Sequence, residues 1–214
     1  GLGDVYKRQI SVPPTLLFSL MGNHRDVRMA VTSDFKSPGD SIYLVGQTHQ
    51  ELGASELAFM LREEGSGGIG GRVPRLDAQR NIAAYRALTG AMSQGLVASA
   101  HDCSDGGLAV ALAECCFGSD SGANIDASAL WAHDEGLDEW GALFGESLGR
   151  ILVSVREGDR DAFESAMAGI DCHRLGEVAE GDEITVTRGE VGLLGASMGA
   201  LREAWTGALS GGAS

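Results

Sequence analysis

Apolar residues recur along this chain in two patterns: short runs typical of buried strands, and longer segments in which they return at helical spacing. Strands are predicted at residues 16–21, 41–46, 96–100, 151–155, 175–178 and 184–186. Helices are predicted at residues 55–61, 77–94, 108–117, 160–168 and 195–209, and segment 128–143 is also interpreted as helical. Mixed strands and helices of this kind indicate an α/β (α+β) layered fold.

The richest candidate chemistry lies where the third predicted strand passes into a helix. There Asp102 and Ser104 are followed by Asp105 and the glycine pair Gly106 and Gly107. Backbone N–H groups at a helix start attract phosphate, and a nearby carboxylate can hold the Mg²⁺ that accompanies a nucleotide. The alternative is an N-cap followed by a tight turn. Caps far outnumber phosphate sites, so these residues alone favour the cap.

Composition limits the class of protein. Of 214 residues, 43% are hydrophobic and 21% are charged, as in ordinary soluble globular domains. The 30 acidic and 16 basic residues give a formal net charge of −14. Nucleic-acid binding needs a basic patch, so no nucleic-acid partner is expected, whereas a nucleotide needs only a few donors and a metal. The 32 glycines are spread along the chain and indicate many tight turns.

Cysteine usage and hydropathy bear on the cellular compartment. Cys103, Cys115, Cys116 and Cys172 form no CxxC pair, which disfavours a disulfide framework or a zinc site. No apolar run approaches the length of a membrane span, and no secretory signal is evident. We therefore expect a reduced, cytoplasmic protein without a membrane segment.

Changes in composition divide the chain into four expected segments. Residues 1–9 resemble a translated sequencing adapter and are interpreted as a non-native leader, so the natural protein is expected to continue upstream of Ile10. Residues 10–64 form a first unit, and the glycine-rich stretch 65–76 is interpreted as a linker. Residues 77–214 form the second unit.

Three sequence blocks, in this order, resemble the synthetase chain of the phosphoribosylformylglycinamidine synthase family of de novo purine biosynthesis. They comprise residues 39–56, 100–114 with its Asp-x-Ser-Asp-Gly-Gly-Leu motif, and 144–155. The family is similar to aminoimidazole ribonucleotide synthetase and its relatives. By this resemblance, residues 10–64 are the C-terminal part of an ATP-binding N-terminal half-domain. Residues 77–214 are then a complete C-terminal α/β layered domain.

The resemblance implies an ATP-dependent, amidine-forming C–N ligase. ATP would phosphorylate the formamide oxygen of formylglycinamide ribonucleotide, and glutamine-derived ammonia would displace that phosphate. The implied cofactors are ATP or ADP and Mg²⁺. The implied partners are the missing N-terminal part of the same enzyme, a glutaminase subunit and a small bridging subunit. The chain alone is expected to be inactive, because the first half of the enzyme is missing.

The resemblance also assigns roles to residues of the motif. Asp102 matches an aspartate that holds Mg²⁺, and Ser104 matches a serine that touches ATP. Gly106 and Gly107 would let the backbone approach the phosphates closely. These residues belong to the second nucleotide site of the family, which resembles a structural site more than a catalytic one. No catalytic residue is therefore assigned.

A second, weaker assignment concerns a loop that resembles a substrate-binding Glu-Ser-Gln sequence of the family. Glu146 and Ser147 match its first two positions. The third position is Leu148, which cannot hydrogen-bond a substrate amide or phosphate. This departure favours a degenerate copy of the substrate loop.

Several other polar residues receive structural interpretations. Arg150 is expected at the surface, paired with Glu146 one helical turn earlier. The side chains of His101 and Asp102 are expected on opposite faces of a strand. His133 and His173, like the other histidines outside the motif, show no ligand spacing and are assigned no role.

Two alternative functions remain open at this point. One is a related synthetase or kinase, of the selenophosphate synthetase or thiamine-monophosphate kinase type. The other is a non-catalytic module that binds a structural nucleotide or holds a partner subunit.

Overall fold

The computed structural model describes residues 17–24, 26–61, 71–119 and 121–210. The chain divides into two compact units, residues 1–30 and residues 31–214.

Within the first unit, the described residues contain one short 3₁₀ helix, η1 (Val27–Met29), capped by the carboxylate of Asp26. The predicted strand at residues 16–21 is wrong, because residues 17–21 have no regular secondary structure. Leu17 and Leu20 are exposed. A strand needs a neighbour for its backbone hydrogen bonds, and the described residues of this unit supply none.

The second unit is built around one sheet, whose order among the described residues is β2-β4-β1-β5-β3-β6-β7. Neighbouring strands are antiparallel except for β3 and β6, which are parallel. The strands are β1 (Ser41–Val45), β2 (Ser99–Asp102), β3 (Gly122–Asp126), β4 (Ile151–Val155), β5 (Cys172–Ala179), β6 (Glu183–Arg188) and β7 (Val191–Ser197).

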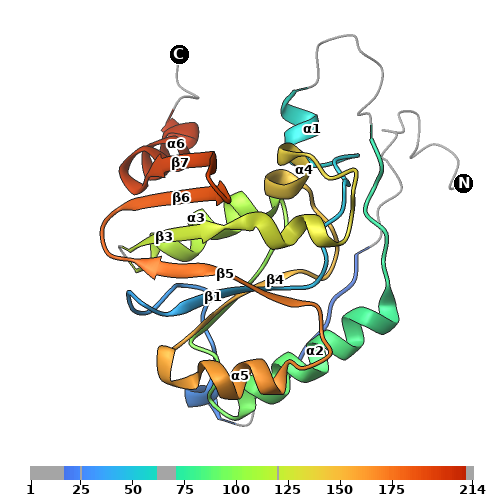
Figure 1. The fold of residues 1–214 in the computed structure, drawn as a ribbon, viewed down its shortest axis with the longest axis vertical. Helices are drawn as coiled ribbons and strands as arrows, with labels where there is room; N and C mark the ends of the chain where they lie inside the picture. Colours follow the sequence, from blue (N-terminus) through green and yellow to red (C-terminus); the bar gives the residue numbers. More distant parts are fainter. Residues whose placement is uncertain (1–16, 25, 62–70, 120, 211–214) are drawn as a thin grey trace, which may run out of the picture. The chain divides into compact units, whose positions relative to one another are not determined.

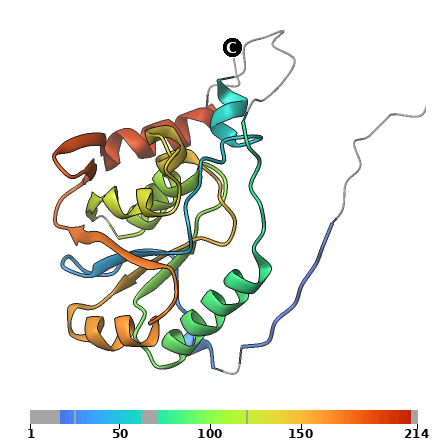
Figure 2. The ribbon, with the colours of Figure 1, turned by 45° about the vertical axis from the view of Figure 1, so that its right-hand side comes forward.

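Helices cover both faces of this sheet, as Figures 1 and 2 show: α2 and α5 on one face, and α3, α4 and α6 on the other. None of the described helices combines the length and the apolar composition that crossing a membrane requires. The helices are α1 (Glu56–Met60), α2 (Ala78–Ser93), α3 (Gly107–Phe117), α4 (Glu139–Phe144), α5 (Arg160–Ala166) and α6 (Met198–Ser210), with the 3₁₀ helices η2 (Ala127–Ala132) and η3 (Glu157–Asp159).

The interior strand β1 is buried at every position because both faces are covered. Side chains alternate along a strand, so Ile42 and Leu44 pack in the core on the α3 side. Tyr43 and Val45 pack in the core on the side of α2 and α5. The layered α/β fold expected from the sequence is therefore confirmed.

Most predicted elements of the second unit are confirmed, with small changes at their ends. The carboxylate of Asp77 accepts a hydrogen bond from the backbone N–H of Arg80 (3.1 Å) and fixes the start of α2. The hydroxyl of Ser55 caps α1 in the same way, 3.2 Å from the N–H of Ala58. The predicted boundary at residues 65–76 stays a prediction, since residues 65–70 lie outside the described residues.

Three predicted elements of this unit have the wrong extent. β2 covers residues 99–102 rather than 96–100; it is an edge strand, where polar residues such as His101 are tolerated. Segment 128–143 is not one helix, because a turn at residues 134–138 separates η2 from α4. The closing helix α6 begins at Met198 instead of residue 195. Residues 195–197 pair with β6 in strand β7, which was missed together with β3.

Candidate functional site

The candidate site is centred on the turn between β2 and α3, where two consecutive glycines have positive φ angles. Gly106 (φ 77°) and Gly107 (φ 65°) occupy the left-handed region that other residues rarely adopt. A Cβ atom on Gly107 would lie 2.5 Å from the carbonyl oxygen of Gly145, and one on Gly106 would overlap the side chain of Val110. Both glycines are therefore required by backbone conformation and by packing.

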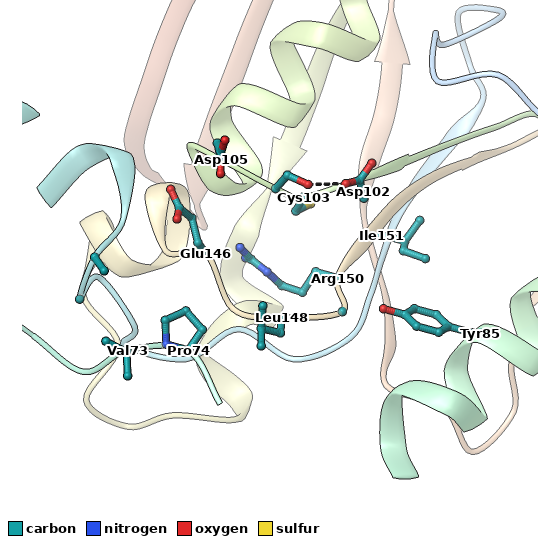
Figure 3. A pocket seen from close by; sticks show the side chains of 14 residues that line it. Val73, Pro74, Tyr85, Asp102, Cys103, Asp105, Glu146, Leu148, Arg150 and Ile151 are labelled. Carbon is teal, nitrogen blue, oxygen red and sulfur yellow. Dashed lines mark hydrogen bonds between the residues drawn. The ribbon is translucent and has the colours of Figure 1, made fainter. Parts of the chain in front are cut away.

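A pocket of about 580 Å³ opens beside this turn (Figure 3). Its described lining combines carboxylates with an apolar wall. The carboxylates come from two separate segments of the chain and belong to Asp102 and Asp105 in the turn and to Glu146. The apolar wall is formed by Val73, Pro74, Tyr85, Leu148 and Ile151.

Asp102 is accessible to solvent, with 70% of its side chain exposed. The hydroxyl of Ser104 donates a hydrogen bond to its carboxylate, drawn as the dashed line in Figure 3. This hydrogen bond is the main reason that the pKa of Asp102 lies below its ordinary value, although partial burial opposes it. An exposed, ionised carboxylate beside a hydroxyl suits Mg²⁺, which prefers oxygen ligands and keeps several of its waters.

His101 lies between two carboxylates. Its Nε2 atom is 2.7 Å from Oε2 of Glu114, and its Nδ1 atom is 3.5 Å from Oδ1 of Asp102. The expectation that His101 and Asp102 face opposite ways is wrong. Asp102 is the last residue of β2, and strict alternation holds only inside a regular strand.

Cys103 follows Asp102 and is buried. Burial raises the pKa of its thiol to about 11. The thiolate is the reactive form of cysteine, so this residue is inert near neutral pH.

Glu146 bridges the starts of two helices. Its Oε1 atom accepts hydrogen bonds from the backbone N–H of Gly106 and from the backbone N–H of Glu56, each at 2.9 Å. Gly106 is the N-cap residue of α3, so a carboxylate already lies where the sequence predicted a phosphate. A phosphate bound in this pocket therefore has an acidic neighbour, which favours its binding together with a divalent cation.

Ser147 does not face the pocket. It is buried, and its hydroxyl accepts a hydrogen bond from the backbone N–H of His49 (3.1 Å). Leu148, the next residue, does line the pocket and is about half exposed. The structure thus brings Glu146 to the residues of the Asp102 turn but separates Ser147 from them.

Arg150 contradicts its predicted surface position, because only 1% of it is exposed. Its Nε atom donates to the carbonyl of Ser147 (3.2 Å), Nη1 donates to Oγ1 of Thr48 (3.1 Å), and Nη2 donates to the carbonyl of Gly145. The i, i+4 pairing with Glu146 fails since residues 145–150 are not helical. Burial lowers the pKa of this guanidinium.

The role of Arg150 is to hold the loop that carries Glu146. It is the one basic residue in the described lining of the pocket, and its donors are directed at protein acceptors. Sequence reasoning missed this role, as well as the wall formed by Tyr85 and Val73. The only local signal was an arginine placed directly before the apolar strand 151–155.

A sequence model of the family described as AIR synthase related protein, C-terminal domain, matches residues 37–189. The fold is similar to that of Thermotoga maritima PurL complexed with FGAR (TM-score 0.69, 19% identity, 82% of this chain and 30% of that chain). It is similar also to T. maritima PurL complexed with ATP (TM-score 0.63, 19% identity, 82% of this chain and 27% of that chain).

A third similar structure is E. coli HypE, a hydrogenase maturation protein (TM-score 0.54, 18% identity, 78% of this chain and 51% of that chain). At these identities the likeness shows a shared fold. The chain spans less than a third of the length of the two PurL chains.

Proposed function

Because the chain belongs, through residues 37–189, to the family of AIR synthase related proteins, C-terminal domain, we propose that it is part of a synthetase of purine biosynthesis. The proposed enzyme converts formylglycinamide ribonucleotide (FGAR) and glutamine-derived ammonia to formylglycinamidine ribonucleotide, at the expense of ATP. This chain supplies the C-terminal part of that enzyme. The proposal is supported by the likeness of its fold to PurL.

The observation that carries the proposal is the pocket at the β2–α3 turn, with carboxylates on one side and an apolar wall on the other. In it, Asp102 would hold Mg²⁺, and Ser104 would contact the nucleotide. The predicted contact of Gly106 and Gly107 with the phosphates is not supported, because neither glycine lines the pocket and their backbone N–H groups already donate to Glu146 and to the carbonyl of Ser104. The apolar wall, which includes Tyr85, suits the flat base of ATP or ADP. Bound Mg²⁺ would neutralise phosphate charge.

The site is proposed as a binding site, with no catalytic residue in this chain. Glu146 is engaged by the backbone N–H groups of Gly106 and Glu56, and Ser147 is buried. Leu148 cannot hydrogen-bond a substrate. These features support a degenerate substrate loop, and the complete reaction would need the rest of the enzyme.

The proposed partners follow from the same reaction. They are the remainder of the synthetase, a glutaminase subunit that would supply ammonia, and a small bridging subunit. The proposed compartment is the cytoplasm, where purine precursors and ATP are available.

Nucleotide binding to this chain tests the proposed site. Isothermal titration with ADP in the presence of Mg²⁺ should give one binding event per chain. Asp102→Asn should weaken it by about tenfold or more, since loss of even an outer partner of a metal costs about this much. The matched control is Asp161→Asn, which removes an exposed carboxylate of α5 outside the pocket. Equal affinities in the wild type and Asp102→Asn would refute the assignment.

A second candidate function is a nucleotide-binding scaffold without a part in the reaction. The position of Glu146 favours it, because a carboxylate at the start of α3 competes with a transferring phosphate. The full-length enzyme separates the two functions. If Asp102→Asn loses bound nucleotide but keeps FGAR-dependent ADP formation, the site is a scaffold.

A further inference from the structure

Three potential metal ligands that are distant in sequence meet at the start of β5. His133 follows the 3₁₀ helix η2, whereas Asp171 directly precedes β5 and His173 is its second residue. Because side chains alternate in extended backbone, Asp171 and His173 are directed to the same face. The side chain of Cys172 between them packs in the opposite core, with α2 and α5.

The ligand atoms of these residues have spacings that suit a tetrahedral metal. Nε2 of His133 lies 2.9 Å from Nε2 of His173 and 3.9 Å from Oδ1 of Asp171. One ligand atom from each of the three residues lies within 4.8 Å of the other two. Zinc bonds of about 2.0–2.2 Å in a tetrahedron separate ligand atoms by about 3.4 Å. The two measured separations lie on either side of that value.

Further residues hold these ligands in place. Nε2 of Gln47 lies 3.3 Å from Nδ1 of His133, and Nε of Arg80 lies 3.5 Å from Oδ2 of Asp171. Arg80 therefore engages the carboxylate oxygen that faces away from His133. Outer contacts of the Arg80 kind orient metal-binding carboxylates in proteins, whereas the amide N–H of Gln47 donates toward Nδ1 of His133 and would have to turn away when a metal binds Nε2. The side chains of His133 and Asp171 are 18% and 29% exposed, so they are shielded yet reachable.

We propose that His133, Asp171 and His173 bind a divalent transition-metal ion of the zinc type, with water as the fourth ligand. Two imidazoles and one carboxylate favour such an ion over Mg²⁺, which prefers oxygen ligands alone. None of the three residues lines the pocket beside Asp102, so this site does not rest on the proposed nucleotide function.

Binding also sets the proton positions on the imidazoles. A metal bound to Nε2 of His133 leaves its proton on Nδ1, facing Gln47. The amide oxygen of Gln47 accepts a hydrogen bond from Nη1 of Arg80, so a second oxygen acceptor is needed at residue 47, and a carboxylate would supply it. Gln47→Glu should therefore tighten zinc binding by about tenfold.

Metal titration of the untagged chain, first stripped with a chelator, tests the site. Calorimetry with Zn²⁺ should give one ion per chain. Co²⁺ should give the strong visible absorption of tetrahedral cobalt, without bands from thiolate ligands. His133→Gln and His173→Gln should each weaken binding by about 100-fold or more, since even outer-partner substitutions cost about 10–100-fold. His24→Gln is the matched control, because it removes an imidazole outside the cluster.

Two results would overturn the proposal. One is the absence of saturable binding of a single ion by the wild type. The other is an unchanged affinity for zinc in both His133→Gln and His173→Gln. This holds also if Asp102→Asn alone abolishes zinc binding. If circular dichroism shows that His173→Gln does not fold, His133→Gln and Gln47→Glu test the site instead. Weaker zinc binding by His133→Gln and tighter zinc binding by Gln47→Glu would support the proposal, and unchanged affinity in both would overturn it.

Discussion

At the scale of single residues, the hydrogen bond from Ser104 to Asp102 is the feature most open to measurement. Ser104→Ala should raise the pKa of Asp102 toward its ordinary value, because this bond is the main cause of the lowered pKa. A pH titration followed by carboxyl NMR measures the change. Ser128→Ala is the matched control for the pKa of Asp102. It removes a hydroxyl that donates to Asp126 in the same way (2.5 Å), away from Asp102. An unchanged pKa of Asp102 in Ser104→Ala would contradict this account.

The lowered pKa of Asp102 also makes the stability of the folded chain depend on pH. The pKa of Asp102 in the folded chain lies below its unfolded value of about 3.9. The unfolded chain therefore binds more protons between these two pKa values. The stabilisation is complete above about pH 4 and is lost as the pH falls through the lowered pKa.

Arg150 offers a second prediction at this scale. Arg150→Met should lower the free energy of unfolding by about 2–4 kcal/mol, since it leaves two carbonyls and a hydroxyl without their buried donor. Denaturant unfolding measures this loss. Arg156→Met is the control, because the side chain of Arg156 is 56% exposed. A loss smaller than about 1 kcal/mol would show that the guanidinium does not hold the loop.

At the scale of elements, the junction of β2 and α3 depends on a glycine that touches another segment. Gly107→Ala should destabilise the chain by about 3–5 kcal/mol, because it combines a left-handed backbone with a Cβ atom only 2.5 Å from the carbonyl oxygen of Gly145. Gly95→Ala isolates the backbone cost, as Gly95 has φ 74° and open space around it. It should cost about 1–2 kcal/mol. Equal losses in thermal unfolding would refute the contact with Gly145.

The elements also show what local pattern can predict. Strand 151–155 was predicted from a short apolar run, and helix 108–117 from apolar residues that recur at helical spacing. β3 and β7 were missed. β7 is glycine-rich and partly exposed, and it forms by pairing with β6. Such strands are stabilised by their neighbours in the sheet, which a local pattern does not contain.

At the scale of the whole molecule, the candidate site also has parts that the local sequence predicts and parts that it does not. Asp102 and Ser104 could be proposed from the sequence because they lie within one short motif. The contact of Glu146 with Gly106 crosses 40 positions of sequence, and the contact of His133 with His173 also crosses 40. Neither pair has a spacing that helix or strand periodicity could reveal. Only the order of strands in the sheet brings them together.

The two proposed cation sites differ in ligand type, which predicts that they act independently. Asp102 and Ser104 offer only oxygen atoms, whereas the cluster of His133, Asp171 and His173 adds two imidazole nitrogens. Mg²⁺ with ADP and Zn²⁺ alone should each raise the thermal unfolding temperature, because each binds the folded chain. At about 100 times its dissociation constant, each ligand should add about 2.7 kcal/mol to the free energy of unfolding.

The two stabilisations should add when both ligands are present, since the sites share no residue. Asp102→Asn should remove only the nucleotide effect, and His173→Gln only the zinc effect. A zinc effect that disappears when Mg²⁺ and ADP are present would mean that zinc binds at Asp102, and the separation of the two sites would be wrong.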